Sequence, residues 1–302
     1  MLVDLNIISH LVLDDKEFIN LGPPRKEISI LGGPPAFATM VIPLLSLKTR
    51  IITAVGNDFP EAYFHYLSSL KSLDLEILKS EKTTRFLHRI YDDGRTMFLL
   101  SQADNLDLFV QKQKGAKACL ISPVFDEISN LSMHWIKKNH NIVGLDVQGF
   151  VRSIDNNNKI ILEFDYEGVK TIIEQADIVK FSLNEAQSFT QRKSYSDIFK
   201  HLSKDITNII TLGTQGIVFN DNDLIYKIEA PVKKETDPTG AGDVLMTGIL
   251  ASLIKNQEVD YSICFGMALA AEKVQHERIH TLPPEDYDST AETILETKKL
   301  VA

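Results

Sequence analysis

The sequence predicts an α/β fold in which helices cover both faces of a mostly parallel sheet, with a small antiparallel appendage. After residue 116, short apolar runs alternate with helix-like stretches, as they do where parallel strands are buried on both faces. Before residue 116, closely spaced extended runs predominate and helical patterns are few. No segment rich in Pro, Gly or Ser divides the chain, so we expect a single domain over residues 1–302.

The N-terminal part supplies the runs from which the appendage would be built. Its extended runs are, in chain order, residues 5–13, 27–31, 50–55, 84–91 and 96–101. Asp-Asp-Gly-Arg at residues 92–95 joins the last two runs, and Asp-Gly between extended runs is a strong hairpin signal. Helical patterns in this part are confined to residues 36–47 and 61–70.

The C-terminal part has the alternation expected of a covered parallel sheet. Apolar runs suited to buried strands occupy residues 117–122, 142–147, 177–181 and 208–212. Helix-like stretches lie between them, at residues 129–138, 166–175 and 196–202. Residues 244–255 and 259–275 follow as two long, strongly apolar helices.

Composition excludes several classes of protein. Asp and Glu number 41 against 32 Lys and Arg, a net charge of −9, whereas a nucleic-acid binder needs a basic surface. Two cysteines, Cys119 and Cys264, are too few for a disulfide scaffold and indicate a reducing compartment. The first residues lack a basic leader, and no apolar run approaches the ~20 residues of a membrane helix. We therefore expect a soluble, cytoplasmic protein that binds neither nucleic acid nor membrane.

The most informative motif is Asp-Pro-Thr-Gly-Ala-Gly-Asp at residues 237–243, directly before the first long apolar helix. Small residues at 240–242 leave backbone N–H groups uncovered at the positive end of a helix, which makes an anion hole. Asp243 lies beside that hole, where a carboxylate could accept a proton from a hydroxyl that attacks a bound phosphoryl group. The alternative is a glycine-rich turn with Asp243 as a helix cap.

The motif at residues 237–243 resembles the C-terminal signature of the ribokinase-like, or PfkB-type, carbohydrate kinases. Four further segments resemble that family in the expected order: residues 32–36, 55–58, 146–152 and 211–216. The resemblance implies a Rossmann-like α/β/α sandwich with a β-sheet lid, here drawn from residues of about 5–31 and 84–101. It also implies an ATP-dependent kinase that transfers the γ-phosphoryl group to a hydroxyl of a small sugar, sugar acid or polyol, with an inositol-like acceptor included.

The same resemblance assigns roles at the transfer site. Asp243 would be the base, and Gly240, Ala241 and Gly242 would supply the anion-hole amides. The cofactors implied are ATP and Mg²⁺, with K⁺ stimulation a weaker expectation. Asp237 would lie beside the monovalent cation.

Further positions are assigned by the same motifs. Thr211, Gly213, Gly216 and Asn184 would contact the nucleotide, and Asp14, Gly32, Gly33, Phe37 and Arg152 would contact the acceptor. Four positions depart from the family pattern, Ser9, Phe37, Glu61 and Gln187, and two of them bear on function. Phe37 replaces an Asn that would read sugar hydroxyls, which suggests a flatter or more apolar acceptor. Gln187 replaces a Glu that would order magnesium-bound water; a neutral amide orders such water less strongly than a carboxylate does, although the neighbouring Glu185 could take its place.

Two other functions remain open at this point. A nucleoside kinase would share the fold and the motifs. A non-catalytic binding protein that kept the fold would fit the loss of the Glu at residue 187, but the complete motif at residues 237–243 argues against it. Two chains could also pair through the lid as a homodimer.

Overall fold

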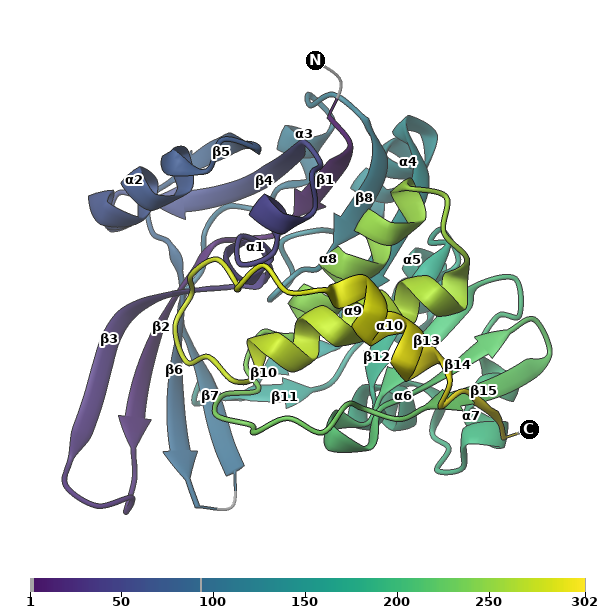
Figure 1. Cartoon of the computed structure of the whole chain (residues 1–302). Helices are drawn as coiled ribbons and strands as arrows, with labels where there is room; N and C mark the ends of the chain where they lie inside the picture. Colours follow the sequence, from purple (N-terminus) through teal and green to yellow (C-terminus); the bar gives the residue numbers. More distant parts are fainter. Residues whose placement is uncertain (1–2, 93, 302) are drawn as a thin grey trace.

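A large helix-covered sheet with a small projecting sheet forms the computed structural model, which describes residues 3–92 and 94–301 (Figure 1). In this part of the chain the large sheet has ten strands and the small sheet four. The arrangement confirms the predicted α/β class, with a mostly parallel central sheet and a smaller second sheet.

Parallel pairing dominates the central sheet. The parallel strands are, in spatial order, β13 (Thr207–Thr211), β12 (Ile178–Ser182), β9 (His140–Asp146), β8 (Ala116–Ile121), β1 (Leu5–Ile8), β4 (Thr49–Gly56) and β5 (Leu73–Ser80). Three antiparallel strands, β14 (Ile217–Asp221), β15 (Leu224–Ile228) and β16 (Lys299–Leu300), extend the sheet beyond β13. The sequence reading missed these three strands and β5.

Helices cover both faces because neighbouring residues of the central strands point to opposite sides. Ile7 and Ile51 belong to a core with α1 (Pro34–Ala38), α8 (Ala241–Ile254), α9 (Val259–Lys273) and α10 (Tyr287–Leu295). Ile8 and Ile52 belong to a second core with α3 (Asp107–Val110), α4 (Asn130–Asn139), α5 (Tyr166–Ile173), α6 (Leu183–Thr190) and α7 (Tyr195–His201). A smaller cluster packs α2 (Glu61–Ser69) beside β5.

The small sheet has the spatial order β3 (Arg25–Gly32), β2 (Val12–Phe18), β6 (Thr84–Tyr91) and β7 (Gly94–Ser101). The predicted hairpin is confirmed, since β6 and β7 pair antiparallel. Asp93 of its turn lies outside the described residues. A separate short hairpin, β10 (Arg152–Ile154) with β11 (Ile160–Leu162), lies against β7.

Two predicted segments are divided differently in the structure. Residues 5–13 do not form one lid strand: β1 belongs to the central sheet, and only β2 enters the small sheet. The reason is burial, because β1 is covered on both faces whereas β2 becomes partly exposed from Asp15 onward. The predicted helix at residues 36–47 is shorter, with α1 followed by a 3₁₀ turn (Ile42–Leu44) that contains Pro43. Within the described residues, no helix has the length and apolarity needed to span a bilayer.

Candidate active site

The loop before α8 leaves backbone amides open. Gly240 precedes the helix with φ +81°, a conformation that favours glycine. Ala241 donates its N–H to the carbonyl of Pro238 at 3.2 Å. Among the described residues, the N–H groups of Gly240 and Gly242 meet no backbone acceptor. Two of the three predicted amides therefore remain free for an anion at the positive end of α8.

Asp243 lies in the first turn of α8, at the carboxyl edge of the central sheet. Only 9% of its surface is exposed, and its Oδ1 accepts a hydrogen bond from Ser122 Oγ at 3.4 Å. Ser122 directly follows β8, so a parallel strand end and a helix N-terminus converge here. Open α/β sheets bind ligands at this edge.

The electrostatic surroundings of Asp243 bring its pKa close to neutral pH. Burial raises the pKa, the Asp146 carboxylate raises it further, and Lys180, Arg152 and Ser122 oppose the rise. The resulting pKa is about 7. A carboxylate with that pKa can take a proton from a hydroxyl at physiological pH, as a general base must.

Lys180 is the main residue that sequence reasoning missed. Its Nζ contacts Asp146 Oδ2 at 2.6 Å in a buried ion pair. Burial would lower the pKa of Lys180, but attraction by Asp146 and Glu185 outweighs it and leaves the pKa raised. A Cβ added at Gly242 would lie 2.9 Å from Nζ, so the ammonium sits beside an open amide. The available signal was a lysine inside an otherwise apolar strand.

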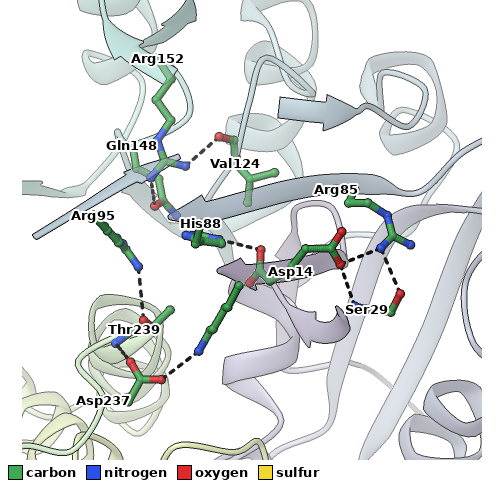
Figure 2. A network of polar contacts seen from close by, with 12 residues as sticks. Asp14, Ser29, Arg85, His88, Arg95, Val124, Gln148, Arg152, Asp237 and Thr239 are labelled. Carbon is green, nitrogen blue, oxygen red and sulfur yellow. Dashed lines mark hydrogen bonds and ion pairs between the residues drawn. The ribbon is translucent and has the colours of Figure 1, made fainter. Parts of the chain in front are cut away.

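A second cationic group, Arg152, lies at the side of the site. Its Nη1 donates to the Val124 carbonyl at 2.9 Å and its Nη2 donates to Gln148 Oε1 at 3.1 Å (Figure 2). Arg152 lines a hollow of about 380 Å³ whose other lining residues are Arg95, Thr96, Met97, Lys159, Ile160, Leu162, Ser182, Asn184 and Glu185. Three basic side chains around one small space favour an anionic ligand.

Glu185 supplies an acidic side chain at the start of α6. It closes a capping box at the start of α6, where Ser182 N–H donates to Glu185 Oε2 at 2.7 Å. Glu185 and Asn184 line the basic hollow, whereas Gln187, two residues further along α6, is not part of its lining. The hollow thus holds the amide of Asn184 and the carboxylate of Glu185 side by side in the chain.

The residues expected at the nucleotide lie on the neighbouring strand end. Thr211 pairs with Ser182 in the sheet register, so both end their strands at the same edge. Gly213 and Gly216 have φ of +60° and +95°, in the turn that follows Thr211. A Cβ at Gly216 would overlap the Ile228 carbonyl, so this close approach also requires glycine.

Asp14, Gly32 and Gly33 lie at the end of the small sheet that adjoins the central sheet. His88 Nε2 lies 3.0 Å from Asp14 Oδ1, and both side chains are buried (Figure 2). A Cβ at Gly32 would overlap the Asp14 carboxylate, and one at Gly33 would lie 2.6 Å from the His10 carbonyl. Gly32 and Gly33 therefore let the end of β3 pass close to the start of β2, with the Asp14 carboxylate directly against Gly32.

A cleft of about 1330 Å³ separates the small sheet from the loop before α8. Asp14, His88 and Gly240 all contribute to its walls. Aromatic and apolar side chains line the rest, among them Phe18, Ile28, Ile30, Leu31, Tyr63, Tyr66, Ile90 and Tyr91. Asp14, expected to contact the acceptor, and Gly240, expected to contact the phosphoryl group, thus line the same cleft.

Phe37 lies below this loop instead of facing the cleft. Its side chain belongs to the core, and a Cβ added at Gly240 would overlap its ring. The ring supports the loop from beneath. The structure therefore gives Phe37 a packing role and does not bring it to the acceptor side.

Asp237 is enclosed by donors. Its Oδ1 accepts from the Thr239 amide at 2.9 Å, and its Oδ2 lies 3.5 Å from Lys16 Nζ. Burial opposes its ionisation, but the Thr239 hydrogen bonds and the charges of Lys16 and Lys273 prevail, so its pKa lies below the ordinary value. Arg95 of β7 donates to Thr239 Oγ1 at 3.3 Å and so joins the small sheet to the loop (Figure 2).

Comparison with known proteins places this chain among kinases. The family model described as pfkB family carbohydrate kinase matches residues 29–285. The cytidine kinase of Thermococcus kodakarensis is 23% identical over 90% of this chain and 96% of that protein. The inositol 3-kinase of Arabidopsis thaliana is 22% identical over 82% of this chain and 68% of that protein.

Solved structures share the fold. A pyrophosphate-dependent kinase in the ribokinase family, complexed with a pyrophosphate analog and myo-inositol, has a TM-score of 0.77 at 21% identity, over 96% of this chain and 100% of that chain. The nucleoside kinase of Methanocaldococcus jannaschii has a TM-score of 0.73 at 19% identity, over 97% of this chain and 99% of that chain.

Proposed function

This chain belongs to the pfkB family of carbohydrate kinases, and from that premise we propose that it transfers the γ-phosphoryl group of ATP to a hydroxyl of a small sugar, sugar acid or polyol. As a member of the family it is a phosphotransferase with an alcohol as acceptor. The observation that carries the proposal is Asp243, a buried carboxylate with a pKa of about 7 beside open amides at a helix N-terminus.

The described side chains divide the reaction between them. Asp243 takes the proton of the attacking hydroxyl, which makes the oxygen a better nucleophile. The amides of Gly240 and Gly242, with the Lys180 ammonium beside them, face the charge that spreads over the transferring phosphoryl oxygens. These dipoles are fixed by the fold, so they need no reorganisation during transfer. The small sheet lines one wall of the cleft, where we expect it to limit the access of water to the transferring group.

The acidic side chain for a divalent cation is Glu185. A divalent cation, when bound, neutralises charge that develops on the phosphates. No cluster of three His, Cys, Asp or Glu side chains suited to a metal occurs in residues 3–92 and 94–301. Mg²⁺ commonly uses one or two carboxylates together with phosphate oxygens and water. Glu185, in the basic hollow beside Asn184, fits that pattern.

Replacing Glu185 by Gln should raise the Mg²⁺ concentration needed for half-maximal rate by about 10–100-fold. Gln keeps the capping box, because either residue type serves at that position, so the helix start should survive. Gln187→Glu is the matched comparison and should behave like the parent. Magnesium titrations of the parent and the two variants measure this concentration. If Gln187→Glu needs less Mg²⁺ than the parent and Glu185→Gln needs the same amount, the magnesium role belongs to residue 187.

A nucleoside acceptor is the second candidate, favoured by the cleft. Its volume of about 1330 Å³ and its lining of Phe18, Tyr63, Tyr66 and Tyr91 suit a planar base as well as a sugar. The similarity to a cytidine kinase also supports a nucleoside acceptor. Asp14, whose Oδ1 is fixed by His88, would receive a ribose or polyol hydroxyl in either case.

The test is a coupled assay of sugars, sugar acids, polyols, inositols and nucleosides, each with ATP and with pyrophosphate as donor. Turnover of a sugar or polyol with ATP supports the first proposal, and turnover of nucleosides alone supports the second. Pyrophosphate is included because a structural relative uses it. A folded protein that binds acceptors and turns over none would be a non-catalytic binding protein.

The pKa of Asp243 also predicts a pH profile. Because the base must be ionised, kcat/KM should be level above pH of about 7 and fall tenfold per pH unit below it. Initial rates at constant ionic strength, with the acceptor identified by the screen, measure this profile. A profile that stays level down to pH 5 would contradict the assignment of Asp243 as base.

Two expectations from the sequence stay predictions. Pairing of two chains through the small sheet would cover Ile28 of β3, whose side chain is 71% exposed, and sedimentation would show a two-chain mass. The other is a cytoplasmic location, which imaging of the tagged protein in intact cells would measure.

A further inference from the structure

The surroundings of Asp237 do not fit the monovalent cation that the family resemblance implies. Such an ion is held by carbonyl and carboxylate oxygens that replace its hydration shell. Here the oxygens near Asp237 already have donors. The Asp237 carbonyl accepts from Lys273 Nζ at 2.7 Å, and the Val274 carbonyl accepts from the amides of Thr236 and Asp237 at 2.7 and 3.0 Å.

The carboxylate of Asp237 is occupied as well. The Thr239 amide donates to Oδ1 at 2.9 Å, and the Lys16 ammonium lies 3.5 Å from Oδ2. An added cation would face two ammonium groups, from Lys16 and Lys273, and like charges at such range repel. The position of the ion is therefore already filled by the protein's own positive charge.

Lys273 is built into this position. It lies in the last turn of α9 and is only 1% exposed, so its charge cannot be solvated by bulk water. Its Nζ also lies 5.4 Å from the centroid of the Phe37 ring, within the range of a cation–π contact. That ring in turn supports Gly240 from below. Lys273 thus contacts Asp237, near the start of the loop at residues 236–242, and Phe37, which packs against Gly240 near the end of that loop.

We propose that the Lys273 ammonium replaces a monovalent cation in this chain and positions the loop at residues 236–242, so that phosphoryl transfer needs no K⁺. The inference rests on the proposed function for its effect on rate, and on the contacts alone for its effect on ion binding. Lys273 lines neither the cleft nor the basic hollow, so it is a positioning residue. Its loss should move the amides of Gly240 and Gly242 away from their productive places.

Two substitutions at the same position separate charge from volume. Lys273→Ala removes the ammonium and leaves room for an ion, whereas Lys273→Met fills the space without charge. Both should lower kcat by about 10²-fold, the effect of a small misplacement at a reacting centre. Added KCl should restore a large part of the rate to Lys273→Ala and none to Lys273→Met. Tetramethylammonium chloride at equal ionic strength is the salt control.

A second readout does not depend on activity. The melting temperature of the parent protein should be the same in KCl and in tetramethylammonium chloride, and that of Lys273→Ala should rise in KCl. Lys298→Met is the control for loss of a partly buried lysine elsewhere, since Lys298 pairs with Asp260 at 3.0 Å and lies over the Tyr226 ring. Its melting temperature should shift equally in both salts.

Several results would overturn the inference. One is a saturable, several-fold stimulation of the parent enzyme by KCl, and another is a KCl-specific rise in the parent's melting temperature. Parental kcat in both Lys273 variants would also overturn it. If neither variant folds, the parent titrations still decide. If no acceptor is turned over, the proposed function fails, while the melting temperatures continue to test ion replacement.

Discussion

Replacing Asp243 by Asn should lower kcat by about 10²–10⁴-fold, the usual contribution of a positioned general base. Asn keeps the shape of the side chain and can still accept from Ser122 Oγ, but it cannot take a proton at neutral pH. The dissociation constant of ATP should change little, because the amides of Gly240 and Gly242 remain in place. Single-turnover rates with the identified acceptor, together with ATP titration calorimetry, measure both quantities.

The contrasting hypothesis is that Asp243 only caps α8. Asn caps helices nearly as well as Asp, so the rate would then survive with a stability change of a few tenths of a kcal/mol. Asp286 provides the matched control, since its side chain accepts from the Ser289 amide as the true cap of α10. Asp286→Asn should keep the parental rate. An Asp243→Asn protein with more than about a tenth of the parental kcat would refute the base assignment.

Replacing Gly240 by Ala should lower kcat by about 10²–10³-fold, the effect of losing an anion-hole donor. Two features of the residue combine. Its φ of +81° costs a non-glycine residue roughly 1–2 kcal/mol. The new Cβ would also overlap the Phe37 ring, so either the loop or the ring must move. Steady-state kinetics should show the loss in kcat, with weaker binding of the phosphoryl donor.

The control for Gly240→Ala is Gly22→Ala. Gly22 has a similar φ of +88°, and a Cβ there would meet no atom within 4 Å. This variant carries the same backbone strain without the overlap, and it should keep the parental kcat. Combining Phe37→Ala with Gly240→Ala should recover the part of the loss that comes from overlap. Parental activity in Gly240→Ala alone would show that the loop does not bind the transferring group.

The sequence by itself determined the fold class and the centre of the candidate site. Apolar runs alternating with helical stretches after residue 116 are local patterns, and the structure has β8, β9, β12 and β13 within a few residues of the predicted positions. The Asp-Gly turn at residues 92–95 likewise predicted the hairpin of β6 and β7. The motif at residues 237–243 is contiguous, so its open amides and Asp243 follow from the chain's own order.

Only the tertiary structure decided which distant side chains complete the site. Lys180 meets Asp146 and Gly242, residues 34 and 62 positions away in the sequence, because parallel strands bring their carboxyl ends to the first turn of α8. That Glu185, and not Gln187, lines the basic hollow depends on where β12 ends and α6 begins. The separation of β1 from the small sheet depends on coverage by helices on both faces.

The same limit explains Phe37 and Lys273. The local sequence around Phe37 or Lys273 does not indicate that the Lys273 ammonium lies over the Phe37 ring next to Gly240. The two residues are far apart in the chain, and Lys273 lies in an apolar helix. Local sequence fixes backbone preferences and the residues that a short loop presents, because these depend on neighbours in the chain. The partners that set a carboxylate's pKa or hold a loop are chosen by packing across layers, and long-range burial is a property of the folded chain alone.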